Sequence, residues 1–120
     1  MNCKCVLLIE DELPVREMMR DVLELEGYQV LSAANGKDAL EALHASPTSP
    51  CVILLDLMMP VMNGWEFLDV LRSSPRHSHV PVVICSAFHE TAKSIRPSAI
   101  LKKPFQLPSL LKTVQAFCAA

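Results

Sequence analysis

The sequence predicts an α/β fold in which a five-stranded parallel sheet is covered by helices on both faces. Three observations indicate this class. Short apolar runs alternate with helical patterns along the whole chain. The first, third and fourth runs are almost continuously apolar, which is typical of parallel strands buried on both faces. The linking segments are helical, and right-handed crossovers through helices produce a doubly wound sheet.

The elements follow from the positions of apolar residues, prolines and glycines. The expected strands are residues 5–9, 28–32, 51–55, 80–85 and 98–101. Pro81 lies near the start of the fourth, where a missing N–H donor is tolerated. The expected helices begin near Pro14, after Asn35-Gly36, at Gly64 and at Leu107.

Length and charge limit the classes of function. The 120 residues suit one domain, 1–120, with enough apolar material for a core. Eleven basic and 13 acidic residues give a net charge of −2, which argues against electrostatic binding to nucleic acid or to an anionic membrane. No apolar run has the length of a membrane span, and the first residues do not resemble a signal peptide. We therefore expect a cytoplasmic protein.

Cysteines and histidines are not expected to carry the chemistry. The five cysteines are odd in number, and three of them lie in or beside apolar runs, which is typical of reduced, buried thiols in a cytosolic protein. The four histidines are expected in loops and on helix surfaces. The cysteines are Cys3, Cys5, Cys51, Cys85 and Cys118, and the histidines are His44, His77, His79 and His89.

Polar side chains follow four of the expected strands. They are Glu10, Asp11 and Glu12 after the first, Asp56 after the third, Ser86 and Ala87 after the fourth, and Lys102 and Lys103 after the fifth. Ligands of open α/β sheets bind beyond the carboxyl ends of the strands. We therefore expect these side chains to converge at one edge of the sheet.

Together these groups predict acceptance of a phosphoryl group on Asp56. Several carboxylates in one pocket repel one another, and Mg²⁺ (or Mn²⁺) beside Glu10 and Asp11 would remove the conflict. A carboxylate nucleophile, a metal, the ammonium of Lys103 and the hydroxyl of Ser86 are the parts that phosphoryl transfer needs. Ala87 is small and leaves the approach to Asp56 open.

The segment 54–64, Leu-Leu-Asp-Leu-Met-Met-Pro-Val-Met-Asn-Gly, resembles the phosphoacceptor loop of the receiver domain of two-component response regulators. Glu10-Asp11 resembles the acidic pair of that family, Ser86-Ala87 its switch hydroxyl and small neighbour, and Lys103-Pro104-Phe105 its lysine motif. The resemblance covers nearly the whole chain and is to a receiver domain of the chemotaxis-regulator-like kind. It implies a flavodoxin-like sheet with strand order 2-1-3-4-5.

The resemblance also implies roles for individual residues. The metal would be held directly by Asp11, by Asp56 and by the backbone carbonyl of Met58, with Glu10 acting through a metal-bound water. Lys103 would pair with Asp56 first and with the phosphoryl group afterwards. The Lys103–Pro104 peptide bond is expected to be cis. Arg16, Met19 and Arg20 of the first helix would dock the phosphoryl donor.

The sequence departs from the family pattern in three places. Ile100 stands where receivers usually carry an aromatic switch residue. Only 17 positions separate Ser86 from Lys103, so the fourth helix is expected to be shortened to residues 89–96, at most two turns, and its face remodelled or partly disordered. Met58 and Phe88 are apolar where polar residues could guide an attacking water, so we expect slow self-dephosphorylation.

The implied function is a phosphorylation-controlled switch, not an enzyme with a separate substrate. A histidine kinase or a histidine phosphotransfer protein would donate the phosphoryl group, and an unidentified output protein would bind the altered state. The alternative is a phosphorylation-independent adaptor of the same fold. The shortened fourth-helix region favours the adaptor, whereas the complete set of Glu10, Asp11, Asp56, Ser86 and Lys103 opposes it.

Two other classes fit poorly. A phosphatase with an aspartyl nucleophile generally needs a second acid two residues later, and Met58 stands there. A nucleotide- or flavin-binding protein needs a phosphate-binding loop after the first strand. The acids at that position would repel phosphate.

Overall fold

The computed structural model describes residues 4–46, 49–57, 59, 61–86, 97–103 and 106–118, and of Ser86 and Lys102 it describes the backbone alone. The strands are β1 (Cys5–Ile9), β2 (Gln29–Ala33), β3 (Val52–Leu55), β4 (Val82–Ser86) and β5 (Ala99–Lys102). The helices are α1 (Leu13–Leu25), α2 (Gly36–Ala45), α3 (Gly64–Ser73) and α5 (Leu107–Phe117). Within the described ranges, no helix is long and apolar enough to traverse a bilayer.

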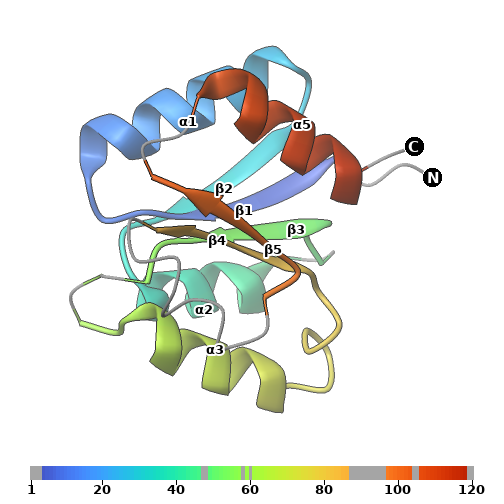
Figure 1. Cartoon of the computed structure of the whole chain (residues 1–120). Helices are drawn as coiled ribbons and strands as arrows, with labels where there is room; N and C mark the ends of the chain where they lie inside the picture. The colour runs from blue at the N-terminus through green and yellow to red at the C-terminus, as the bar shows by residue number, and fades with distance from the viewer. Residues whose placement is uncertain are drawn as a thin grey trace.

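The strands form one parallel sheet in the order β2-β1-β3-β4-β5, which confirms the predicted fold (Figure 1). The chain moves outward from β1 to β2, then crosses back to β3 and continues in the other direction. The order therefore switches between β1 and β3, and the carboxyl ends of these two strands, where ligands of such sheets bind, are here called the crevice. Every expected strand lies within two residues of an observed one.

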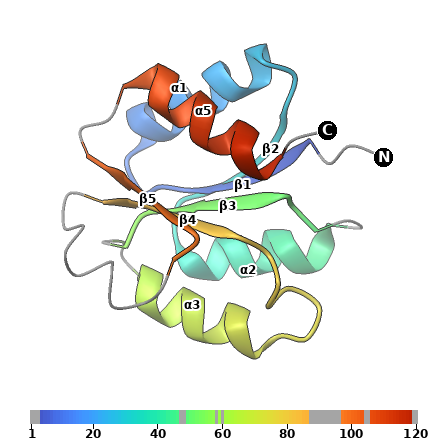
Figure 2. The ribbon, with the colours of Figure 1, turned by 45° about the vertical axis from the view of Figure 1, so that its right-hand side comes forward.

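Helices cover both faces of the sheet, with α1 and α5 on one side and α2 and α3 on the other (Figures 1 and 2). Alternate strand residues enter the two resulting cores because side chains of a strand point to opposite faces. Leu7 and Ile9 of β1 pack on the side of α2 and α3, whereas Val6 and Leu8 pack on the side of α1 and α5. Apolar strands buried on both faces follow directly from this arrangement.

Asparagine side chains fix the starts of α2 and α3. The Asn35 side chain accepts a hydrogen bond from the Asp38 backbone N–H at 2.9 Å. Asn63 accepts one from Glu66 N–H at 2.9 Å, and the Glu66 carboxylate accepts one in return from Asn63 N–H at 3.2 Å. Such reciprocal capping satisfies N–H groups that the first helical turn leaves without partners.

Two glycines hold the connection between β3 and α3 in place. A Cβ on Gly64 would lie 2.7 Å from the Leu57 Cα and 3.1 Å from the Asp56 carbonyl oxygen. A Cβ on Gly36 would lie 2.8 Å from the Met62 Cγ, and Gly36 N–H donates to the Met62 carbonyl at 3.0 Å. The first turn of α3 therefore packs directly against the backbone of Asp56, the residue that follows β3.

The expectation for His77 is confirmed, and the expectation for the cysteines is wrong. His77 lies in the connection between α3 and β4, as predicted, although only 2% of it is exposed. Burial there is compatible with an uncharged ring. The expectation of reduced cysteines fails for one pair, because the sulfurs of Cys51 and Cys118 are joined as a disulfide.

Of the departures from the family pattern, the structure describes Ile100 but not the fourth-helix segment. The fourth-helix segment 89–96 is outside the described residues, so the prediction that it is shortened remains a prediction. Ile100 lies on β5 opposite Ile84 of β4 and packs, half-buried, against the core on the side of α2 and α3. An aliphatic side chain thus fills the position where the family usually has an aromatic one.

We predict that Gly64→Ala destabilises the protein by about 1–3 kcal/mol, because the new methyl group meets the backbone of Leu57 and neither can move freely. Urea denaturation measures the change. The control is Val70→Ala at an exposed position of the same helix, which should alter the free energy of unfolding by less than about 0.5 kcal/mol. Equal effects of the two substitutions would contradict the close approach.

We predict that His77 makes the fold sensitive to acid. Burial, and then the charges of Arg76, His44 and His79, lower the pKa of His77 below its ordinary value of 6.5. Protonation is thus harder in the folded state, so stability is intact above pH 6.5 and is lost as pH falls toward the lowered pKa, by up to about 1.4 kcal/mol per pH unit.

The matched variant is His77→Phe, which keeps a ring and removes the titration. It also removes a buried Nε2 that has no hydrogen-bond partner among the described residues. Denaturation of both proteins at pH 7.5 and pH 5.0 should show a smaller acid loss for His77→Phe. Parallel losses in the two proteins would rule out His77 as the source.

Candidate functional site

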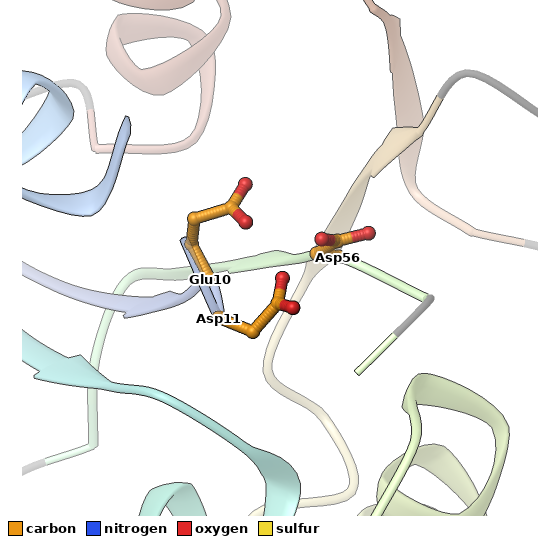
Figure 3. A group of neighbouring side chains, drawn as sticks. All are labelled: Glu10, Asp11 and Asp56. Atoms are coloured by element: carbon orange, nitrogen blue, oxygen red, sulfur yellow. The ribbon is translucent and has the colours of Figure 1, made fainter. Parts of the chain in front are cut away.

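Three carboxylates meet at the crevice where the strand order switches. Glu10 and Asp11 follow β1, and Asp56 follows β3, the strand beside it (Figure 3). One oxygen of each lies within 4.8 Å of an oxygen of the other two. Glu10 and Asp56 are buried, with 1% and 6% exposed, whereas Asp11 is accessible to solvent. The predicted acidic cluster is therefore present in the structure.

The sheet itself positions the two buried acids. The ladder of hydrogen bonds continues one residue past the strands, with Glu10 N–H donating to the Ala33 carbonyl at 3.0 Å and Asp56 N–H donating to the Ile9 carbonyl at 3.0 Å. Both backbones are thus held on a rigid edge. Their backbones cannot separate without breaking the sheet pairing that anchors them.

Lys103 reaches the cluster from β5, which lies two strands away from β3. Its Nζ is 2.6 Å from Glu10 Oε1 and 3.6 Å from Asp56 Oδ2. Burial alone would lower the pKa of Lys103, but the hydrogen bond that it donates to Glu10 and the negative charges of Asp56 and Glu10 raise this pKa above its ordinary value. The side chain is a permanent cation at neutral pH and stands closer to Glu10 than to Asp56, the partner that the resemblance implied.

The Glu10 carboxylate has a fixed orientation. Its Oε1 accepts from Lys103, and its Oε2 accepts from the Glu12 backbone N–H at 3.2 Å. Its own backbone carbonyl accepts a hydrogen bond from Arg16 Nη1 at 2.8 Å. Arg16 therefore stabilises the turn that carries Glu10 and Asp11.

The cluster has a net negative charge that a divalent cation would neutralise. Among the residues that the structure describes, three carboxylates and the Lys103 ammonium leave a formal charge of −2. Two carboxylates at such separations repel by roughly 3 kcal/mol at the effective dielectric of a protein surface. Carboxylate oxygens are the ligands that Mg²⁺ prefers. A Mg²⁺ ion at Asp11 and Asp56, beside Glu10, would bring the formal charge to zero.

The first helix presents a different surface from the one expected. Met19 was expected to dock a phosphoryl donor, but only 1% of it is exposed and it packs in the core beneath α1. Arg16 points back to the Glu10 carbonyl, and Arg20 lies 3.8 Å from carboxylate oxygens of both Asp21 and Glu24. The expectation is therefore wrong for Met19. Met19 is buried because its position along α1 turns its side chain toward the sheet, so it cannot contact a donor protein.

Part of the predicted site lies outside the described residues. Met58, Ala87, Phe88 and Pro104 are not described, and neither is the side chain of Ser86. The metal ligand at the Met58 carbonyl and the cis bond before Pro104 therefore remain predictions. The backbone of Ser86 ends β4 opposite Lys102, so the residue stands at the edge of the sheet where the prediction put it.

The thiol of Cys85 is buried near the charged groups of the site. Cys85 of β4 is buried, and this burial raises the pKa of its thiol to about 12, with Lys103 acting to lower it and Glu10 and Asp56 acting to raise it. The group is thus an uncharged thiol at neutral pH. It contributes packing and no charge to the crevice.

An open parallel sheet with the strand order 2-1-3-4-5 and helices on both faces is the flavodoxin-like fold of α/β proteins. The sequence matches the family model of the response regulator receiver domain over residues 6–115. The chain belongs to this family, the receiver domains of two-component signalling.

Individual relatives agree with this assignment. The chain is 28% identical to the polar-differentiation response regulator DivK of Brucella anthropi, with 95% of each protein aligned. It is 34% identical to the transcriptional regulatory protein CpxR homolog of Haemophilus influenzae, with 92% of the chain aligned to 48% of that protein. The chain thus spans about half the length of this second relative.

Solved structures show the same fold. The chemotaxis protein CheY4 of Vibrio cholerae superposes with a TM-score of 0.85 at 30% identity, covering 96% of this chain and 98% of that one. The receiver domain of the sensor histidine kinase PA1611 of Pseudomonas aeruginosa superposes with a TM-score of 0.87 at 23% identity, covering 98% and 99%. That structure holds a magnesium ion coordinated in its active-site cleft.

We predict that Asp11→Asn stabilises the metal-free protein by about 0.5–1 kcal/mol, because one of three mutually repelling charges disappears. The same substitution should abolish the rise in melting temperature that Mg²⁺ produces in the unmodified chain, since an amide is a poor ligand for a hard cation. Thermal unfolding in chelator and in excess Mg²⁺ measures both effects.

The control is Glu17→Gln, which removes one charge from the exposed surface of α1. It should leave the Mg²⁺ effect intact and change stability by less than about 0.5 kcal/mol. A destabilised Asp11→Asn protein in chelator, or one that still responds to Mg²⁺, would contradict the role given to Asp11.

Proposed function

We propose that the protein is a phosphorylation-controlled switch that accepts a phosphoryl group on Asp56 from a histidine kinase or a histidine phosphotransfer protein. The observation that carries the proposal is the convergence of Glu10, Asp11 and Asp56 with Lys103 at one switch point. The family assignment supports the same function. Because such kinases use ATP, the exchange would take place in the cytoplasm.

The residues divide the work of transfer between them. One Asp56 oxygen would attack phosphorus in line, and the bond between phosphorus and the donor imidazole would break with its electron pair remaining on nitrogen. Lys103, already positioned 3.6 Å from Asp56 Oδ2, would carry positive charge to the phosphoryl oxygens. The hydroxyl of Ser86 would donate a hydrogen bond to one of them.

A divalent metal, Mg²⁺ or Mn²⁺, would be held by Asp11 and Asp56 directly, by the Met58 carbonyl and by Glu10 through water. When bound, it supplies charge neutralisation at the phosphoryl oxygens. The chain's own contribution is to keep the acids fixed on adjacent strands. Arg16 would support this through its hydrogen bond to the Glu10 carbonyl.

The signal would arise from a change of partner for Lys103. In the unphosphorylated chain its closest contact is Glu10, at 2.6 Å. A phosphoryl group on Asp56 adds negative charge and new acceptor oxygens, so Lys103 and Ser86 would be drawn to it. The change would shift the population of two packed states and create a surface for an output protein. With Met58 and Phe88 apolar beside the acceptor, the chain would lose the phosphoryl group slowly.

A phosphorylation-independent adaptor is the competing function. Such a protein would keep the sheet and helices without needing an acidic cluster. Buried like charges at Glu10 and Asp56 cost stability, and a purely structural role does not explain their presence. The cluster therefore favours the phosphorylated switch.

We predict that incubation with acetyl phosphate and Mg²⁺ adds one phosphoryl group to the chain, and that Asp56→Asn abolishes the addition. An amide oxygen is too weak a nucleophile to form the acyl phosphate. Intact-protein mass spectrometry measures the phosphorylated fraction, with chelator replacing Mg²⁺ in a parallel sample.

Asp69→Asn, at an exposed site on α3, is the matched control and should be phosphorylated like the unmodified chain. Full phosphorylation of Asp56→Asn, or equal phosphorylation with chelator, would refute the proposed chemistry. No uptake by the folded, unmodified chain under any of these conditions would favour the adaptor.

A further inference from the structure

A covalent bond links the end of the chain to the sheet. Cys51 and Cys118 are 67 positions apart, yet their Cα atoms lie 5.4 Å apart and their sulfurs form a disulfide. This Cα separation is within the range that disulfides require. Cys51 directly precedes β3, and Cys118 directly follows α5. The bond therefore joins the first residue before one element to the first residue after another.

The same position accommodates both redox states. Cys51 Sγ lies 3.1 Å from the carbonyl oxygen of Cys5, so a thiol at this site has an acceptor for its S–H. The Cys51 backbone N–H also donates to that carbonyl at 2.9 Å, which fixes the residue beside β1 whether or not the disulfide is present. Loss of the disulfide would thus not remove the anchor of Cys51.

The disulfide is placed to act on the two segments that carry the site. Cys51 and Asp56 stand at opposite ends of β3, and Lys103 and Cys118 stand on opposite sides of α5. The linked residues lie at the amino-terminal end of β3, opposite the carboxyl end that carries Asp56. A bond between them limits how far α5 can move relative to β3.

We propose that Cys51 and Cys118 are a reversible redox modification site whose oxidised form fastens α5 to β3. The reagent class is a small-molecule disulfide such as oxidised glutathione. One protein thiol attacks it to give a mixed disulfide and releases one thiol; the second protein thiol then displaces the other. The two cysteines lose two electrons and two protons in total, and the reagent becomes two thiols.

Access to the pair is local. Only 4% of Cys118 is exposed, but the residue follows the last turn of α5 and its backbone N–H bonds to Val114 within that turn. Fraying of one helical turn would present its sulfur to a reagent. Cys85 needs opening of the sheet interior and is the natural internal standard, while Cys5 lies beside Cys51 and is the competing partner to exclude.

The test equilibrates the full chain in glutathione buffers that range from reducing to oxidising, traps free thiols in acid, and alkylates them after denaturation. Peptide mass spectrometry should show Cys51 and Cys118 losing alkylation together as one linked peptide pair, with Cys85 alkylated throughout. Cys5→Ser should behave in the same way. Cys51→Ser and Cys118→Ser should each leave the remaining cysteine of the pair alkylated.

A second measurement tests the fastening of α5 and needs no variant that could misfold. Amide hydrogen exchange in α5 should be slower in the oxidised than in the reduced unmodified chain, and the melting temperature should be higher, because the bond closes a long loop. Full alkylation of both cysteines in the most oxidising buffer, or pairing of Cys51 with Cys5, would overturn the site. Unchanged exchange in α5 on oxidation would overturn its effect.

The redox site does not depend on the proposed phosphorylation. Both readouts are made in the absence of acetyl phosphate and Mg²⁺, so failure of one proposal leaves the other standing. The site is also distinct from the acidic crevice, since neither cysteine contributes to the cluster of Glu10, Asp11 and Asp56.

Discussion

The repulsion among three carboxylates is the constraint on which the rest of this structure depends. Glu10 and Asp56 are almost wholly removed from solvent, and one ammonium balances only part of their charge. A protein that needed stability alone would replace such a group with apolar residues, because buried like charges oppose folding. The sheet must therefore supply the energy that keeps the acids together, and it does so through apolar strands buried on both faces.

The need for the sheet to hold repelling acids together explains the contacts around the crevice. Acids on adjacent strands cannot relax apart, because their backbones are paired to the sheet at 3.0 Å on either side. Gly64 brings α3 against the backbone under Asp56, and Arg16 holds the carbonyl of Glu10. Only Lys103 reaches the cluster on a long side chain, so among these groups it is the one that can change partner at low cost.

The sequence was sufficient for the fold and for the acidic cluster because both follow from local patterns. Buried strands are continuous apolar runs, and the parallel sheet places whatever follows them at one edge. Contacts that leave no pattern of residue types in the sequence could not be predicted from it. Arg16 binds a backbone carbonyl, which leaves no trace in residue types, and Met19 belongs to an apolar stripe whose buried side depends on helix rotation. His77 and the Cys51–Cys118 pair depend on tertiary packing between distant segments.

The disulfide and the acidic crevice lie at opposite ends of the same two supports. Cys51 precedes and Asp56 follows β3, and in the chain Lys103 precedes and Cys118 follows α5. In the proposed switch a phosphoryl charge at the crevice would attract Lys103, whereas the bond at the amino-terminal end of β3 would resist displacement of α5. Each site can be present without the other, and their free energies would be coupled only if both displaced α5 relative to β3. The arrangement would allow a receiver domain to respond to thiol chemistry at one end of β3 and to phosphorylation at the other.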